Sequence, residues 1–257
     1  MDRGAIQAEW HEYWSGWSRK TDDVIGEAMI TIYVNGIELV TLMCTPLEQD
    51  LLGLGFLKNE GLIDRLDEVD HVHIGANGCC VDVWLTRAMQ EPQRRILTSG
   101  CGSGVTFGDP LEAIEPLKDN VQIEPEHLMS FFNRMHKPDS LRARARGVHT
   151  ASLTDGDKLL LISEDVGRHN TIDKLAGMCL MNGMETRGLI LLTTGRISSE
   201  MLRKGYAMGC PIIASRTSPT SLSLKLADAA GITLVGYARQ GRLRAYAHPH
   251  RLGFIDE

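Results

Sequence analysis

The sequence lacks the features that mark a membrane, exported or nucleic-acid-binding protein. No apolar run approaches the roughly 20 residues that a membrane-spanning helix needs. The first residues also lack the basic-then-apolar order of a signal peptide. Aromatic residues make up only 5% of the chain, and no basic helix or stacking-aromatic motif points to nucleic acid. We therefore expect a soluble, cytoplasmic protein with neither a membrane nor a nucleic acid as its partner.

Cysteine is also too sparse and too scattered for a disulfide scaffold. The chain has six cysteines, none in a Cys-x-x-Cys pair, and no His/Cys cluster has the spacing of zinc ligands. This pattern favours reduced thiols in a cytoplasm and no structural metal. The cysteines are Cys44, Cys79, Cys80, Cys101, Cys179 and Cys210.

What the chain does have is a large apolar fraction and an uneven charge distribution. Its 257 residues are 43% hydrophobic and 23% charged, enough for one large domain or two smaller ones. Residues 1–137 carry 11 basic and 22 acidic residues, whereas 138–257 carry 16 and 11, and 12 of those 16 are arginines. Because the planar guanidinium grips phosphate well, the second half is a candidate for binding a phosphorylated ligand. A solvated surface of mixed charge remains the alternative.

The first half of the chain reads as two hairpins and a helix. Asn35-Gly36 lies between two alternating apolar runs, a strong signal for a tight β-turn. Thr45-Pro46-Leu47-Glu48 predicts a helix start that continues to about Gly61. Extended runs at 71–74 and 80–85 predict a second hairpin, and the Gly/Ser-rich residues 98–108 predict irregular structure.

The second half alternates strands with helices. Strands are predicted at 149–153, 159–163, 189–193, 211–215, 232–237 and 244–246, and helices at 126–135, 170–181, 198–208 and 219–229. This order is typical of an α/β sandwich with a largely parallel, mixed sheet. We expect an N-terminal extension at 1–25, a smaller β-rich domain at 26–120 and an α/β domain at 121–257.

The first candidate for chemistry is Cys101. Three glycines surround it in residues 98–104, so its thiol is sterically open to attack another macromolecule. A flexible loop that happens to contain a cysteine is the plainer alternative. The other five cysteines fit strands, helices or a turn edge, which favours packing roles.

Arginines also follow several predicted strands. Arg168 lies in the polar run 163–170, Arg196 in 194–200 and Arg216 in 215–220, each at the step from a strand into a helix. Backbone N–H groups, hydroxyls and guanidinium groups at such steps can bind an anion, although they can equally serve as ordinary helix caps. Two more arginines frame a glycine turn in Tyr237-Ala238-Arg239-Gln240-Gly241-Arg242, which suggests either nucleotide binding or a plain hairpin.

Taken together, these segments resemble the formate dehydrogenase accessory sulfurtransferases of the FdhD/NarQ family. The matching segments are 54–63, 98–102, 147–151, 164–174, 195–200, 218–222, 234–236, 241–242 and Tyr246. They cover most of residues 26–248 in order. The run from Glu164 to Lys174 is the most specific of them.

The resemblance implies a β-rich N-terminal portion and a cytidine-deaminase-like C-terminal α/β domain, in a homodimer. Zinc deaminase chemistry does not follow, because the His-x-Glu and Pro-Cys-x-x-Cys motifs are absent. It implies a sulfurtransferase that takes persulfide sulfur from a cysteine desulfurase and passes it to a molybdenum bis(molybdopterin guanine dinucleotide) cofactor. That cofactor is destined for the formate dehydrogenase catalytic subunit.

The resemblance also assigns residues. Cys101 matches the persulfide-bearing position, and residues 237–242 match the segment that binds the cofactor. Arg168, Arg196 and Arg216 are our own additions to that binding set. The family motif commonly reads Cys-Gly-x-Cys, but Gly104 stands here in place of the second cysteine. Two hypotheses follow: Cys101 alone carries the sulfur, or the protein binds the cofactor as a chaperone without sulfur transfer. A guanine-nucleotide-binding regulatory protein is a third reading.

Overall fold

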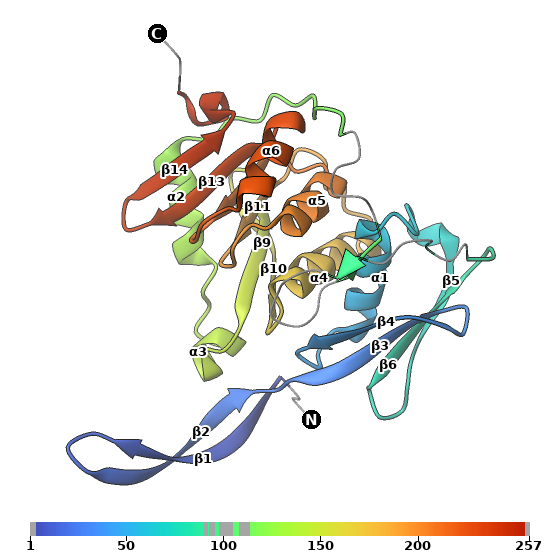
Figure 1. Ribbon diagram of the computed structural model, residues 1–257, viewed down its shortest axis with the longest axis vertical. Coiled ribbons are helices and arrows are strands. Elements are labelled where there is room, and N and C mark those ends of the chain that lie inside the picture. Colours follow the sequence, from blue (N-terminus) through green and yellow to red (C-terminus); the bar gives the residue numbers. More distant parts are fainter. Residues whose placement is uncertain (1–3, 90–91, 93–95, 98–104, 108–113, 255–257) are drawn as a thin grey trace.

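Two separate β-sheets organise the chain in the computed structural model, which describes residues 4–89, 92, 96–97, 105–107 and 114–254 (Figure 1). The larger sheet has six strands in the order β10-β9-β11-β12-β13-β14. β11, β12 and β13 are parallel, whereas β9, β10 and β14 join them in antiparallel pairs. The strands are β9 (His149–Thr154), β10 (Leu159–Asp165), β11 (Ile190–Thr193), β12 (Ile212–Ser215), β13 (Thr233–Arg239) and β14 (Arg242–Ala247). The expected mixed α/β sheet is confirmed.

Helices cover both faces of this sheet. On one face lie α4 (Arg168–Met181), α5 (Ser199–Ala207) and α6 (Ser221–Ala229), whose apolar side chains pack with Leu191 and Ile213. On the other face, α2 (Pro125–Arg134) and the short η2 (Pro249–Leu252) pack with Ile190, Leu192 and Ile212. The alternation along β11 follows the two-residue period of a strand. A strand buried on both faces explains why these runs are almost entirely apolar.

The smaller sheet has the order β4-β3-β6-β5 and is covered on one face by α1 (Gln49–Asn59). Its strands are β3 (Ala28–Val34), β4 (Ile37–Cys44), β5 (Val69–Ile74) and β6 (Cys80–Leu85), and a short η1 (Leu66–Glu68) precedes β5. Both predicted hairpins are confirmed. At the first turn, Asn35 and Gly36 both have positive φ, as the sequence pattern requires.

The two sheets are joined by a close crossing of α1 and α4 (Figure 1). A Cβ atom added to Gly55 of α1 would lie 1.7 Å from the Asp173 carbonyl oxygen, and one added to Gly177 of α4 would lie 2.0 Å from the Leu51 carbonyl oxygen. Glycine is therefore required at both positions, because any side chain would push the helices apart.

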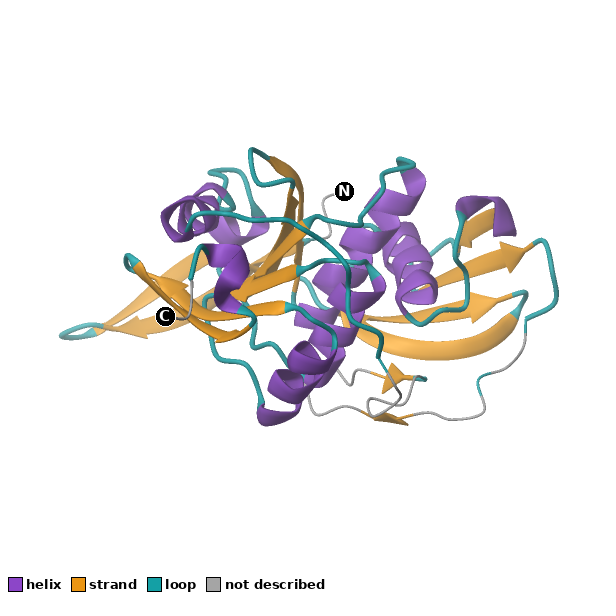
Figure 2. Cartoon of the chain, turned by 90° about the horizontal axis from the view of Figure 1, so that it is seen from above, coloured by secondary structure: helices purple, strands orange, loops and turns teal. Residues whose placement is uncertain are grey.

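A third element projects away from both sheets as a long arm (Figures 1 and 2). β1 (Ala5–Tyr13) pairs antiparallel with β2 (Trp17–Ile25) over their whole length. Near its base, Asp23 forms an ion pair at 2.9 Å with Arg144 of the short helix α3 (Leu141–Ala145). The aromatic tip is open to solvent, with Trp14 84% exposed. Our sequence reading predicted neither these strands nor α3.

The start of α1 differs from the prediction. Thr45 was expected to cap this helix, but the helix begins at Gln49, after Glu48 in the left-handed region. Thr45 is fully buried instead. Its backbone N–H donates to Asp165, and its hydroxyl accepts from the Val166 backbone N–H. Tertiary hydrogen bonds to the other sheet have therefore replaced a local cap. No helix in the described ranges is long and apolar enough to cross a membrane.

Candidate functional site

The predicted arginine segments meet along one edge of the six-stranded sheet. β11, β12 and β13 are parallel, so their carboxyl ends lie at the same edge, and β10 ends there too, where Asp165 pairs with His149 at the start of β9. The N-termini of α4, α5 and α6 follow directly. Such an edge is where open α/β sheets commonly bind ligands, because loops and helix N-termini converge on it.

Arg168 lies close to the turn that follows β11. A Cβ atom added to Gly195 would lie 2.9 Å from the Arg168 Cβ and 3.4 Å from His149 Nδ1. Arg168 is only 4% exposed, so most of its side chain is held by packing. Arg196, one residue after Gly195, is exposed. The sequence places these two arginines 28 residues apart, and the fold brings their segments into contact.

The contacts continue along the edge to the next two strands. The Ser215 hydroxyl donates to the Gly195 carbonyl at 2.6 Å, and the Thr217 carbonyl accepts from the Tyr237 backbone N–H at 3.1 Å. Arg216 sits between these two contacts and donates from Nη1 to His136 Nε2 at 2.8 Å. The turns after β11 and β12 are thus linked to each other and to the last residues of β13, along an edge of the sheet that we call the arginine edge. It comprises Arg168, Arg196, Arg216 and residues 237–242.

The histidines near this edge are held neutral, so the arginines supply its positive charge. Burial, with help from the charges of Arg142 and Arg216, lowers the pKa of His136 below its usual value. Burial and the Arg168 charge likewise lower the pKa of His149. For His169, burial lowers the pKa to about 2, with Arg168 as the next cause. A neutral imidazole is also what the Arg216 bond requires, since His136 Nε2 must accept a hydrogen there.

The turn between β13 and β14 has unusual backbone geometry. Tyr237 has φ 54° and lies at a register shift in the β13–β14 pairing. Positive φ is strained for an aromatic residue and often marks a functional position. The guanidinium carbons of Arg239 and Arg244 lie 5.9 and 4.5 Å from the Tyr237 ring centre. Cations stacked on an aromatic ring make a surface suited to phosphate and a planar base.

Not every residue of the predicted binding segment faces outward. Arg239, Gln240, Gly241 and Arg242 are exposed, and Gln240 and Gly241 form the tight turn with positive φ at both residues. Ala238 is 1% exposed and packs in the core beneath, so only its backbone can contribute to binding. His136 and His149 border the edge but were not singled out individually from sequence. His149 at least lies in a segment that carries the family resemblance.

Cys101, the predicted sulfur-bearing residue, lies outside the described residues, and so does Gly104. The chain on either side of their segment is described. β7 (Ile96–Leu97) pairs antiparallel with β8 (Val105–Thr106), and the pair nearest the segment is Leu97 with Val105. The described residues on either side of 98–104, Leu97 and Val105, are therefore neighbours in this short stem.

The buried cysteines among the described residues are poorly suited to carry sulfur. Burial raises the pKa of Cys44 to about 12 and that of Cys179 to about 11, and it also raises the pKa of Cys210. All three are therefore protonated, weakly nucleophilic thiols at neutral pH. Cys79 is exposed at a turn, and Cys80 is partly buried.

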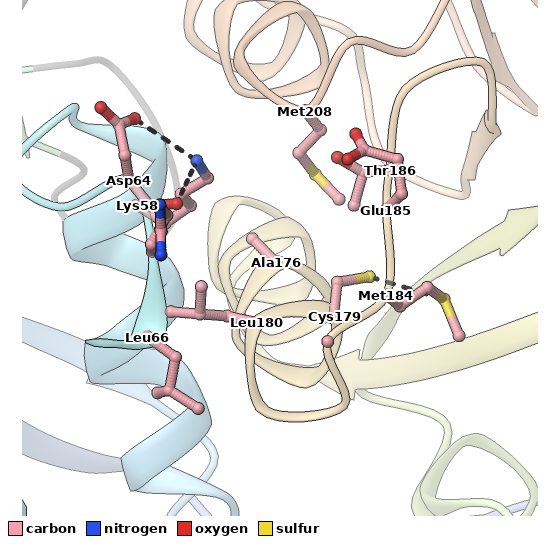
Figure 3. Close-up of a pocket in the computed structure, with 12 residues that line it drawn as sticks. Lys58, Asp64, Leu66, Ala176, Cys179, Leu180, Met184, Glu185, Thr186 and Met208 are labelled. Atoms are coloured by element: carbon pink, nitrogen blue, oxygen red, sulfur yellow. Dashed lines mark hydrogen bonds and ion pairs between the residues drawn. The ribbon is translucent and has the colours of Figure 1, made fainter. Parts of the chain in front are cut away.

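Cys179 borders a cavity of about 320 Å³ between α1 and the C-terminal half of α4 (Figure 3). Its sulfur lies 4.0 Å from the Met184 sulfur, and Leu66, Ala176 and Leu180 add apolar surface. Because the Cys179 thiol is protonated and the residue is 2% exposed, Cys179 does not provide this cavity with a reactive thiolate. The predicted packing role of Cys179 fits this placement.

Comparison with known proteins decides the family. The family model described as the FdhD/NarQ family matches residues 25–253. The chain belongs to the FdhD/NarQ family. Two FdhD/NarQ relatives are the sulfur carrier proteins FdhD of Bacillus subtilis (strain 168) and Staphylococcus aureus (strain MRSA252). The first is 34% identical over 96% of this chain and 97% of its own length, and the second is 32% identical over 90% of each.

A solved structure shares this fold. It is a crystal structure described as that of a formate dehydrogenase accessory protein from Desulfotalea psychrophila. It matches with a TM-score of 0.80 and 28% identity over 97% of this chain and 99% of that one. The family model begins at residue 25, so nearly all of the arm formed by β1 and β2 precedes the family match.

Proposed function

We propose that this protein is a sulfurtransferase that carries sulfur as a persulfide on Cys101. It takes the sulfur from a cysteine desulfurase and delivers it to a molybdenum bis(molybdopterin guanine dinucleotide) cofactor bound as substrate. The cofactor then serves a formate dehydrogenase catalytic subunit. Relatives named sulfur carrier protein and a structural neighbour described as a formate dehydrogenase accessory protein support this proposal. We place the reaction in the cytoplasm, carried out by a homodimer.

The observation that carries the proposal is the arginine edge. The cofactor has two nucleotide ends, each with a diphosphate and a guanine. Arg239 and Arg242 flank an exposed glycine turn, while Arg168, Arg196 and Arg216 lie along the adjoining strand ends. His136, His149 and His169 have lowered pKa values, so the positive charge of the edge comes from its arginines. Phosphate oxygens accept charge-assisted bonds from guanidinium groups, and a guanine can stack beside Tyr237.

The sulfur step needs one open thiolate. The Cys101 thiolate attacks the terminal sulfur of the desulfurase persulfide, so a new S–S bond forms at Cys101 while the old one breaks. The desulfurase cysteine leaves as a thiolate. Passing the sulfur on as sulfide takes two electrons, which a thiol reductant or the metal centre must supply. A second cysteine is not required for loading, so Gly104 is compatible with this step.

A second candidate function is cofactor binding without sulfur transfer. Gly104, in place of the second motif cysteine, favours it, because glycine can neither receive the persulfide sulfur nor resolve an oxidised Cys101. This chaperone would use the same arginine edge. The two functions therefore differ in whether Cys101 becomes loaded.

Intact mass after incubation with a cysteine desulfurase and cysteine distinguishes them. We expect one added sulfur on the wild-type protein, removed by a thiol reductant, and none on Cys101→Ala. Cys79→Ala is the matched control, since Cys79 is exposed in the described structure, and it should load like the wild type. No added sulfur on the wild type, under conditions where a two-cysteine homologue loads, would support the chaperone instead.

The binding half is tested with GDP as a stand-in for one nucleotide end. We expect Arg239→Ala with Arg242→Ala to weaken GDP binding by at least about tenfold, because each lost charge-assisted bond is worth about 1.5–3 kcal/mol. The control removes two exposed arginines elsewhere, Arg19 and Arg65, each paired with a nearby carboxylate. Equal GDP affinity in both double variants would show that the site is misplaced.

A further inference from the structure

A buried carboxylate, that of Glu60, holds the end of the stem formed by β7 and β8. Oε2 of Glu60 accepts two hydrogen bonds from the end of the stem, one from the Thr106 hydroxyl at 2.9 Å and one from the Phe107 backbone N–H at 2.8 Å. The Glu60 side chain is only 3% exposed, and Thr106 is also buried. Buried bonds to a charged acceptor are among the stronger hydrogen bonds in proteins.

The other oxygen of Glu60 connects the stem to helices α4 and α5. Its Oε1 lies 3.3 Å from Lys204 Nζ of α5, and Lys204 also contacts both carboxylate oxygens of Asp173 of α4 at 2.8 and 3.0 Å. Asn59 of α1 adds a bond to Asp173 at 2.8 Å. One buried cluster thus joins three helices and the stem.

Two aromatic rings reinforce this attachment. Phe107 packs edge-on against Phe56 of α1, with ring centres 5.9 Å apart and planes at 89°. The ammonium of Lys204 lies 5.1 Å from the centre of the same Phe56 ring. The stem is therefore held by apolar as well as polar contacts to the same cluster.

The cluster is matched to a carboxylate, with its two acceptor oxygens, at position 60. Burial alone would lower the pKa of Lys204, but the charges of Asp173, Glu60 and Glu200 outweigh it and raise that pKa, so the ammonium stays protonated. Thr106, Phe107 and Lys204 all present hydrogens to Glu60. A glutamine has one acceptor oxygen and would turn its own N–H donors toward one of these donors.

The same two helices also carry part of the arginine edge. Along α4, Arg168 and His169 lie one turn before Asp173, and along α5, Glu200 lies one turn before Lys204. His169 Nε2 and Glu200 Oε2 are 3.3 Å apart. The first turns of α4 and α5 therefore border the ligand edge, and the next turns hold the stem.

We propose that Glu60 is a positioning residue, which holds β8 at a fixed place relative to the arginine edge. β8 begins at Val105, four residues after Cys101 in the sequence. The inference rests on the proposed sulfur transfer for its consequence, but not for its geometry. The sulfur must pass from another macromolecule to Cys101 and then to a bound cofactor. Each transfer depends on such placement, because small misplacements of the reacting atoms slow it steeply.

The test compares Glu60→Gln with the matched variant Glu68→Gln. The Glu68 carboxylate also accepts two backbone N–H bonds, from Asp64 and Arg65, and its other oxygen pairs with Arg87, so its described partners belong to the smaller sheet and its loops rather than to the stem. We expect Glu60→Gln to slow loading of Cys101 by the desulfurase by about tenfold or more. Alkylation of Cys101 by iodoacetamide should stay within about threefold of wild type, since a small reagent needs no placement. Glu68→Gln should behave as wild type in both assays.

Hydrogen exchange at the Phe107 amide gives a readout that does not depend on sulfur transfer. We expect exchange at this amide to speed up by about tenfold or more in Glu60→Gln and to stay unchanged in Glu68→Gln. The neutral amide oxygen of glutamine is a weaker acceptor than a carboxylate, and the amide N–H₂ group would face a donor in the cluster. If the wild type takes up no sulfur, the proposed function fails, and this exchange result still decides whether Glu60 holds the stem.

Thr106 provides a second pair in case Glu60→Gln does not fold. Thr106→Val removes the hydroxyl bond to Glu60 while keeping the side-chain shape, and Thr106→Ser keeps the hydroxyl. Slower loading in the valine variant with normal loading in the serine variant supports the inference. Wild-type loading and wild-type Phe107 exchange in Glu60→Gln, or wild-type loading in Thr106→Val, would overturn it.

Discussion

Replacing Gly55 by alanine tests the helix crossing on which the site is built. The added Cβ would lie 1.7 Å from the Asp173 carbonyl oxygen, whereas ordinary carbon–oxygen contacts are at least about 3.3 Å. α1 and α4 must then separate locally by more than about 1 Å. A gap of that size forfeits a quarter to a half of each van der Waals contact across the crossing. Overpacking with some backbone movement typically costs about 1–3 kcal/mol, and this site has backbone on the opposing side.

We therefore expect Gly55→Ala to lower stability by at least about 3 kcal/mol. For a chain of this size that corresponds to a melting temperature about 6–12 °C lower, measured by calorimetry or circular dichroism. Gly16→Ala is the matched control, because nothing lies within 4 Å of a Cβ there, and it should change stability by less than about 0.5 kcal/mol. Equal melting temperatures for the two variants would refute the close crossing.

Three further predictions concern buried groups. Lys174→Met removes the positive charge that faces the Asp165 carboxylate, where both side chains are fully buried and 2.7 Å apart. Chemical denaturation should show a free energy of unfolding lower by about 3–5 kcal/mol. A decrease below about 1 kcal/mol would contradict that burial. Iodoacetamide at pH 7.5 should label the exposed Cys79 well before Cys179, whose pKa is raised to about 11, and peptide mass mapping that finds the reverse order would contradict this. Burial lowers the pKa of His169 from 6.5 to about 2, so the NMR signals of its ring should stay those of a neutral imidazole from pH 8 to pH 4. The unfolded chain binds this proton below about pH 6.5 and the folded protein does not, so the stability of the fold should fall as the pH drops below 6.5. A ring that titrates near pH 6.5 would contradict its burial.

Local patterns predicted most of the regular elements. The Asn35-Gly36 turn works because both residues tolerate positive φ whatever surrounds them. In the second half, buried strands bounded by turns and amphipathic helices repeat in order, and the structure reproduces them within a few residues at each end. Such signals depend on neighbouring residues in the sequence, so they predict strands and helices without knowledge of the fold.

Where local rules failed, distant residues had taken over the groups concerned. Thr45 has the sequence of a helix cap, but Asp165 and Val166, about 120 residues later, hydrogen-bond to it instead. The arm was missed because its exposed strands lack a buried face, so apolar and polar residues do not alternate clearly along them. These errors lie where the two sheets meet and at the exposed arm, not within the apolar core of either sheet.

The residue types of the candidate site were visible in the sequence, and their arrangement was not. Arginines at strand ends indicate anion binding one segment at a time. The bond from Arg216 to His136, 80 residues earlier, has no local signal in the sequence. It exists only because the fold brings the residue after β12 next to the end of α2. The role of Glu60 has no local sequence signal either, since its partners Thr106 and Lys204 are 46 and 144 residues away.

The sequence by itself determined the chain's family, its alternating elements and the chemical groups available, because motifs and periodicity are properties of neighbouring residues. Only the tertiary structure decided which strand ends share an edge, how closely α1 and α4 approach, and which carboxylate holds the stem formed by β7 and β8. Those outcomes depend on burial and on hydrogen bonds between distant segments. Such bonds gain their strength only once folding has excluded water from around them.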